Sequence, residues 1–180
     1  MLGLFGHYQF RSQLETRWHR LYRVAYSWCH DIQLASDLVQ EVFAKALKKR
    51  HQLRDTKALD VWLFTIMTNC WRDHCRQQRD MVDVDDVSLV QESYPEEEND
   101  RNKVITRVRT AITKLSHDQR QIVTLVDLEG LSYGEVAEVL GIPVGTVMSR
   151  LCRARQNLKK YLHDLEYEIK ESSPKIRRIK

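Results

Sequence analysis

The sequence has little of what most enzymes need. Its 180 residues include only 6 glycines and 3 prolines. We find no glycine-rich phosphate loop, no histidine pair of the metalloprotease type and no nucleophile elbow. The sequence therefore predicts a protein that is not an enzyme, with no catalytic residues, no cofactor, no bound metal and no small-molecule substrate.

Long apolar runs are also absent. No segment approaches the length of a membrane span, and the first ten residues lack the charged start and cleavage pattern of a signal peptide. The four cysteines are scattered over predicted helices, which is typical of free thiols in a reducing compartment: Cys29, Cys70, Cys75 and Cys152. We expect a cytoplasmic protein with no membrane span and no disulfide.

Apolar residues instead recur at the spacing of helices, and alternation typical of strands never exceeds a few residues. The pattern predicts an all-α fold. Helices are expected at 8–29, 34–49, 61–79, 104–115, 116–128 and 133–140, and from 144 to about 162. The arginines on the polar side of the first of these, Arg17 and Arg20 among them, are interpreted as a solvated face.

An acidic segment divides the chain. Nine acidic residues occur from Asp80 to Asp100, with no lysine or arginine among them. Such a segment cannot bury enough apolar area to fold alone, and its like charges extend it. It predicts a flexible linker between two small helical domains, although its charge could also mimic a nucleic-acid backbone. We place the domains at 1–80 and 101–163, the linker at 81–100 and a basic-ended tail at 164–180.

The second domain contains the strongest local signal. Ser132 with Glu135 forms a capping-box pattern, Gly141 fits the end of the helix that follows, and Pro143 fits the start of the next. From Val144 on, one side of the last helix is apolar and the other is polar and basic. Two helices joined by a tight turn predict a helix–turn–helix for the major groove of DNA, with an ordinary helical hairpin as the alternative.

The 61–79 helix carries aromatic and basic side chains together. Aromatic rings beside arginines suit single-stranded nucleic acid, because bases stack on rings while cations follow phosphates. We interpret Trp62 as a core residue and leave Trp71 open between the core and nucleic acid. Cys70, His74 and Cys75 could share a metal, but a zinc site needs four ligands and no second pair stands nearby.

Two blocks of sequence together resemble a known family. The first joins DLVQEVF, from Asp37 to Phe43, with WLFTIMTN, from Trp62 to Asn69, and the second runs from Asp127 to Arg155. In this order, and separated by an acidic linker, they resemble bacterial sigma factors of the extracytoplasmic-function (ECF) group of the sigma-70 superfamily. The resemblance covers nearly the whole chain.

The resemblance implies a transcription initiation factor with two DNA-binding domains, sigma regions 2 and 4. Its partners would be core RNA polymerase, promoter DNA and an inhibitory anti-sigma factor. The residues implied for polymerase binding are Asp37, Gln40 and Glu41. Those implied for the minus-ten element, where a loop at 53–60 would capture a flipped base, are Leu53, Asn69, Arg72, Arg76 and Arg79. Those implied for the minus-thirty-five element are Met148, Ser149, Cys152 and Arg153.

Two positions depart from the family's usual residues. Met148 stands where a basic side chain is common, and Leu53 where an aromatic one often lines the melting loop. Because methionine cannot make the bidentate contact that arginine makes with guanine, readout would depend on Arg153 and on DNA shape. Two alternatives remain: a free-standing helix–turn–helix regulator, and a metal-dependent enzyme using Cys70, His74 and Cys75.

Overall fold

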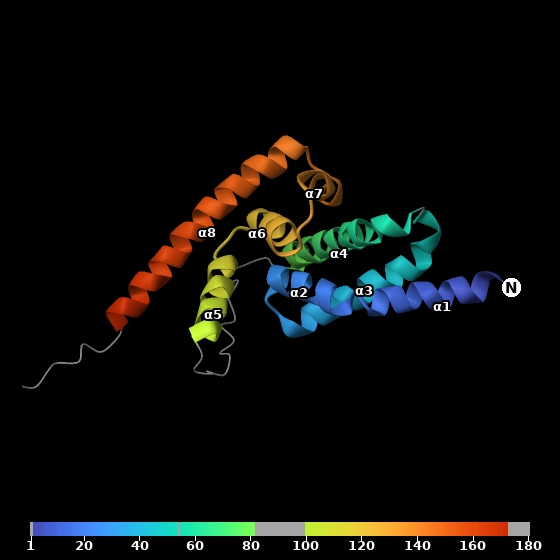
Figure 1. Ribbon diagram of the computed structural model, residues 1–180, viewed down its shortest axis with the longest axis horizontal. Coiled ribbons are helices and arrows are strands. Elements are labelled where there is room, and N and C mark those ends of the chain that lie inside the picture. The colour runs from blue at the N-terminus through green and yellow to red at the C-terminus, as the bar shows by residue number, and fades with distance from the viewer. Residues whose placement is uncertain (1, 54, 82–99, 173–180) are drawn as a thin grey trace, which may run out of the picture.

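The computed structural model describes the backbone of residues 2–53, 55–81 and 100–172, and the side chains of 8–53, 55–78 and 104–164. All regular elements in those ranges are helices, which confirms the predicted all-α fold (Figure 1). The predicted linker lies outside the described residues except at its ends. In the part of the chain that is described, no helix is long and apolar enough to cross a membrane.

Four helices build the N-terminal half: α1 (Leu2–Glu15), α2 (Trp18–Cys29), α3 (Ile32–Lys49) and α4 (Leu59–Met81). Helix α3 packs against both α2 and α4. Its apolar positions fall on one side because they recur every three or four residues, and Leu38, Val39 and Val42 are buried there. Asp31 starts α3 by accepting a hydrogen bond from the Leu34 backbone N–H at 2.7 Å.

The prediction of one helix over 8–29 is wrong, because α1 ends at Glu15 and α2 begins at Trp18. At the break, the Thr16 hydroxyl and the Arg17 guanidinium both donate to the Gln13 carbonyl, at 2.9 and 3.0 Å. The Arg17 N–H turns instead to the Leu14 carbonyl at 2.9 Å, one residue short of the α-helical partner. Side chains that compete for backbone carbonyls thus end the helix without glycine or proline.

The C-terminal half contains α5 (Asp100–Thr113), α6 (His117–Val123), a π-helical turn (Thr124–Leu128), α7 (Tyr133–Leu140) and α8 (Val144–Ser172). The prediction of one helix over 116–128 is therefore corrected at its second half. There the Glu129 N–H bonds the Thr124 carbonyl at 3.0 Å, a five-residue spacing, and the Thr124 hydroxyl donates to the Arg120 carbonyl at 2.8 Å.

The helix–turn–helix is confirmed in detail. The Ser132 side chain accepts from the Glu135 N–H, and the Glu135 carboxylate accepts from the Ser132 N–H, so the capping box is complete. The Ser132 hydroxyl and the Ser132 N–H both donate to the Glu135 carboxylate, and they lower the pKa of Glu135 below its ordinary value because they stabilise its charged form. Gly141 ends α7 in the left-handed region at φ 64°, and α8 begins at Val144. Helix α8 continues to Ser172, so the start of the predicted tail is helical.

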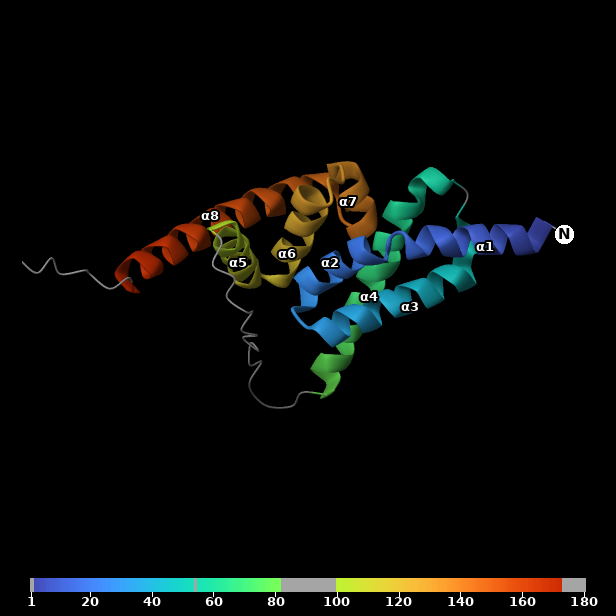
Figure 2. The same cartoon turned by 60° about the horizontal axis from the view of Figure 1, so that its bottom comes forward.

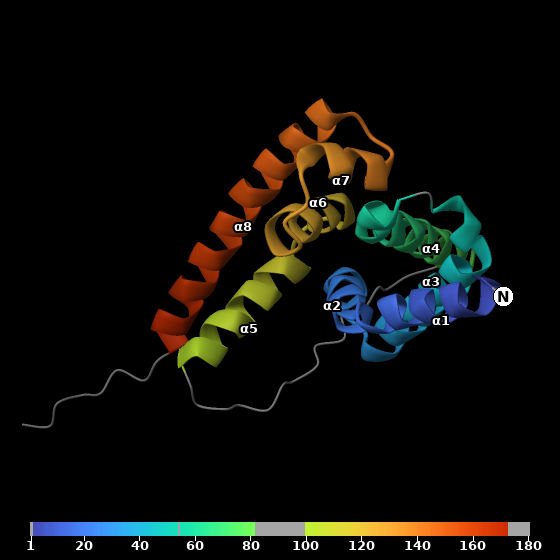
Figure 3. The same ribbon diagram turned by 45° about the vertical axis from the view of Figure 1, so that its right-hand side comes forward.

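The two halves pack against each other. Helix α7 lies on α4, α2 contacts α5 and α6, and α5 runs beside α8 (Figure 3). One continuous set of buried side chains includes Leu21 and Phe64 from the first half and Ile122 and Leu125 from the second. Helix α1 and the far end of α8 lie at opposite ends of the molecule (Figure 2). The packing brings residues from the two halves into direct contact at the candidate sites.

Candidate nucleic-acid and polymerase interfaces

The residues predicted to bind polymerase share an exposed strip on α3. Asp37, Gln40 and Glu41 are all exposed. Within the helix, Gln33 donates to the Asp37 carboxylate at 3.1 Å, and Lys45 pairs with Glu41 at 2.8 Å. Pairs of this kind on a surface hold side chains loosely, and each contributes only about 0.2–0.5 kcal/mol. The strip therefore remains available to a partner.

The loop before α4 places Leu53 and Asn69 differently. The loop contains two short 3-10 turns, Arg50–Gln52 and Thr56–Ala58, and Leu53 follows the first. Leu53 is half-buried against the core, whereas Asn69 is exposed on α4. Just after the loop, in the first turn of α4, the Asp60 carboxylate accepts hydrogen bonds from the guanidinium groups of Arg17 and Arg20.

On the α4 face predicted to bind the minus-ten element, part of the surface is covered. Trp71 is only 6% exposed, and its ring stacks with His74 and with His117 from the other half. Its indole N–H donates to the His117 Nε2. Arg72 donates to the Leu140 carbonyl, the last residue of α7. The sequence left open whether Trp71 lies in the core or contacts nucleic acid. In the structure it is buried, in the contact between the two halves.

Of the other predicted residues of this face, Asn69 and Arg76 are exposed. Arg76 is exposed and lies 3.9 Å from Asp73 on its own helix. The Arg79 side chain lies outside the described residues. Trp62, expected in the core, is half-buried and meets the Phe10 ring edge-on at 6.5 Å between centroids. In this arrangement, Trp71 and Arg72 contact the second half, whereas Asn69 and Arg76 are exposed.

The recognition helix α8 presents the predicted readers outward. Val147, Leu151 and Ala154 are buried, which confirms the apolar side. The predicted readers of the minus-thirty-five element are all exposed: Met148, Ser149, Cys152 and Arg153. The Ser149 hydroxyl donates to the Thr146 carbonyl at 3.1 Å and can still accept.

Two other arginines of α8 are held by carboxylates of the same half. Arg150 pairs with Asp118 at 2.7 Å. Arg155 donates to both oxygens of Asp127, at 3.2 Å from Nε and 2.5 Å from Nη2. These pairs join α8 to α6 and to the π-helical turn. They add modestly to the packing that positions α8, which comes from its buried apolar side.

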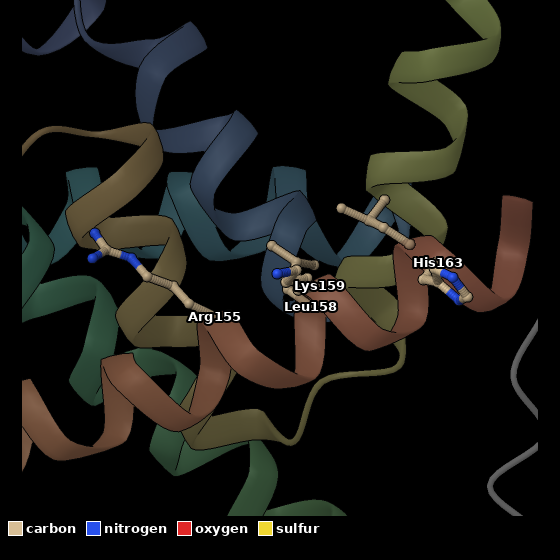
Figure 4. Close-up of a pocket in the computed structure, with 5 residues that line it drawn as sticks. Arg155, Leu158, Lys159 and His163 are labelled. Carbon is tan, nitrogen blue, oxygen red and sulfur yellow. The ribbon is translucent and has the colours of Figure 1, made fainter.

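Two shallow hollows lie along α8. One is lined by Tyr133, Met148, Leu151 and Cys152, together with Arg155, Gln156 and Lys159. The next is lined by residues that project from successive turns of α8: Arg155, Leu158, Lys159, Leu162 and His163 (Figure 4). Leu158 also packs against the core. Both linings combine apolar and cationic side chains.

Sequence reasoning missed the residues that join the halves, and the interpretation of Arg17 and Arg20 as a solvated face is wrong. Arg20 bonds the Asp60 carboxylate, the Glu129 carboxylate and, at 3.3 Å, the Glu129 carbonyl. Burial alone would raise the pKa of Asp60, but the two guanidinium groups outweigh it and lower that pKa. No periodicity could reveal Glu129 as a partner 109 residues away.

Arg120 is a second contact between the halves that the sequence did not reveal. Its guanidinium donates to the Ile112, Thr113 and Leu115 carbonyls near the end of α5, and at 2.8 Å to the Trp28 carbonyl of α2.

Burial, together with repulsion from Arg120, lowers the pKa of His30 to about 4. Burial also raises the pKa of the Cys29 thiol to about 11. That thiol is therefore protonated and unreactive at neutral pH.

The residues of the metal-enzyme alternative do not converge. Cys70 is buried, while Cys75 faces His117 with 3.9 Å between Sγ and Nε2. Over the side chains that the structure describes, no group of three histidine, cysteine or acidic residues is arranged to hold a metal.

Comparison with known proteins identifies the family. The sigma-70 region 2 model matches residues 16–81, and the sigma-70 region 4 model matches residues 105–158. The chain is 32% identical over 159 residues to the RNA polymerase sigma-H factor of Pseudomonas aeruginosa, covering 82% of each chain. It is 35% identical over 129 residues to the ECF RNA polymerase sigma factor EcfG of Rhodopseudomonas palustris, covering 72% of this chain and 71% of the relative.

A solved structure agrees. The sigma factor RpoE from Bartonella quintana, in complex with the anti-sigma factor NepR, matches with a TM-score of 0.68 and 29% identity, over 86% of this chain and 97% of that one. The chain belongs to the ECF group of the sigma-70 family of RNA polymerase sigma factors. Proteins of this family initiate transcription and are not catalytic, which excludes the metal-enzyme alternative. The region 2 match likewise excludes a regulator built from a helix–turn–helix alone.

Proposed function

We propose that the chain binds core RNA polymerase through the α3 strip of Asp37, Gln40 and Glu41. Helix α4 and its preceding loop then engage the minus-ten element through Leu53, Asn69, Arg72, Arg76 and Arg79. Helix α8 engages the minus-thirty-five element through Met148, Ser149, Cys152 and Arg153. The single observation that carries this proposal is the exposed face of α8, held by a complete capping box and two ion pairs.

The polymerase contact is supported by its charge and accessibility. Asp37 and Glu41 lie one helical turn apart and are both exposed, so together they offer a negative surface to a basic partner. Reversing both charges, as Asp37→Lys with Glu41→Lys, should abolish co-purification with core polymerase while the helical circular dichroism stays unchanged. The matched control is Glu138→Lys, an exposed charge reversal on α7 that should leave co-purification intact.

Run-off transcription with purified core polymerase tests the function itself. The full chain should direct initiation from promoters selected out of random DNA, and core polymerase alone should not. A chain that binds DNA but gives no run-off product would refute the proposal.

We also infer regulation by an anti-sigma factor and activity in the cytoplasm. The support is that the sigma factor RpoE of Bartonella quintana was solved with the anti-sigma factor NepR bound. A protein recovered with the tagged chain must inhibit run-off transcription when it is purified and added back. A recovered protein that leaves transcription unchanged is not the regulator.

A further inference from the structure

We propose that α8 reads thymine methyl groups through the apolar hollow of Tyr133, Met148 and Cys152. The inference rests on the proposed function, in which α8 enters the major groove of the minus-thirty-five element, and it names the base edge that the helix selects there.

The hollow faces outward on the side of α8 that carries the readers. Met148 is 53% exposed and Tyr133 is 38% exposed, whereas Leu151, which also lines the hollow, is 2% exposed. Met148 and Cys152 are four residues apart, so their side chains adjoin on one face of the helix. Within that face, an unbranched thioether and a thiol present a soft apolar surface with only weak hydrogen-bonding capacity.

An ion pair at the edge of the hollow engages Arg155. Arg155 lines the hollow and donates to both oxygens of Asp127. Because its guanidinium is paired with Asp127, Arg155 does not serve as a base reader. Lys159, also in the lining, supplies positive charge at the rim.

The chemistry of the major groove selects the ligand. Thymine is the one base that presents a methyl group there, while guanine and adenine present acceptors at N7. A purine N7 placed against the Met148 side chain would lose its water without gaining a hydrogen-bond donor, which is unfavourable. A thymine methyl gains by leaving water. The cationic rim matches the flanking phosphates, so the occupant is duplex DNA with thymine facing the hollow.

The test is to remove single methyl groups from the DNA. Holoenzyme reconstituted from core polymerase and the full chain first selects its promoters from random DNA. Each thymine of the selected minus-thirty-five element is then replaced by deoxyuridine, which lacks only the C5 methyl. At one or two adjacent positions, the wild-type holoenzyme should bind the uracil promoter about fourfold more weakly, the factor expected for one buried methyl group.

Variants assign that effect to the hollow. Met148→Ala should bring the thymine-to-uracil affinity ratio close to one, and Met148→Leu, which keeps an apolar side chain of similar volume, should preserve it. Lys160→Ala is the matched control: this exposed residue lies farther along the same helix, and its loss should weaken both promoters equally and leave the ratio unchanged.

The inference is overturned if the holoenzyme selects promoters but no uracil substitution weakens binding, or if the weakening persists in Met148→Ala. A chain that selects no promoter at all would instead overturn the proposed function, and the inference with it. The two failures are therefore distinguishable.

Discussion

The two surfaces that we propose bind DNA differ in how far they are covered. On α4, Trp71 is buried against His117, and Arg72 bonds the Leu140 carbonyl at the end of α7. On α8, the reader face is exposed from Met148 to Arg153. Region 4 therefore leaves the exposed face of α8 accessible, while it covers part of the α4 face of region 2.

The difference has a physical cause. The readers of α8 lie opposite an apolar side that packs on α6 and α7, so the packing of region 4 leaves them outward. The α4 face instead carries Trp71, an apolar ring that gains by burial and that stacks between His74 and His117. We expect the same ring to become available only when the two halves separate.

The largest predicted effect concerns the contact between the halves. Arg20→Ala removes the partner of Glu129, whose side chain is only 5% exposed, and of Asp60. An unpaired carboxylate in that position should cost about 2–3 kcal/mol in the free energy of unfolding, measured by urea denaturation. X-ray scattering should show a larger radius of gyration as α7 leaves α4. Arg23→Ala, an exposed arginine on the same helix, is the control and should change neither measurement.

A smaller effect is expected on the open surface. Arg153→Ala should weaken promoter binding by about 1–3 kcal/mol, the range for one base contact, without changing stability. Arg150→Ala should instead affect mainly stability, because Arg150 pairs with Asp118. The free energy of unfolding should fall by less than about 1 kcal/mol, and promoter affinity should change less than in Arg153→Ala. A fluorescence titration against labelled promoter measures the first quantity, and equal affinity for wild type and Arg153→Ala would contradict this assignment.

A third effect concerns pH. His30 has a pKa of about 4 in the folded chain against an ordinary 6.5, so the unfolded chain binds the extra proton between those values. Stability should therefore fall as pH drops from about 6.5 towards 4, by roughly 1–2 kcal/mol once the exposed part of the ring is allowed for. His30 sits in the left-handed region at φ 55°, which asparagine tolerates. In His30→Asn, thermal melts across this window should show a flatter pH dependence; an unchanged slope would show that another group titrates.

Local signals explain which parts of the fold could be predicted from the sequence. Ser132, Glu135 and Gly141 act on their own neighbours, so the helix–turn–helix and the outward face of α8 follow from a few residues. The break before Trp18 could not be predicted, because Thr16 and Arg17 end the helix through side-chain bonds that many helices do not make. The bonds from Arg20 to Glu129 and from Arg120 to Trp28 depend on packing between distant segments. Local sequence patterns could not predict them, because the partners are far apart in the chain.

The most direct test measures the distance between α4 and α7 in the free chain and in the promoter complex. Spin labels at Gln77 and Glu138, both exposed, would be read by electron paramagnetic resonance after replacement of the four native cysteines. We predict a short, narrow distance distribution in the free chain and a longer one once core polymerase and promoter DNA are bound. An unchanged short distance in an initiating complex would contradict the account, because region 4 would then cover Trp71 and Arg72 while the minus-ten element is engaged.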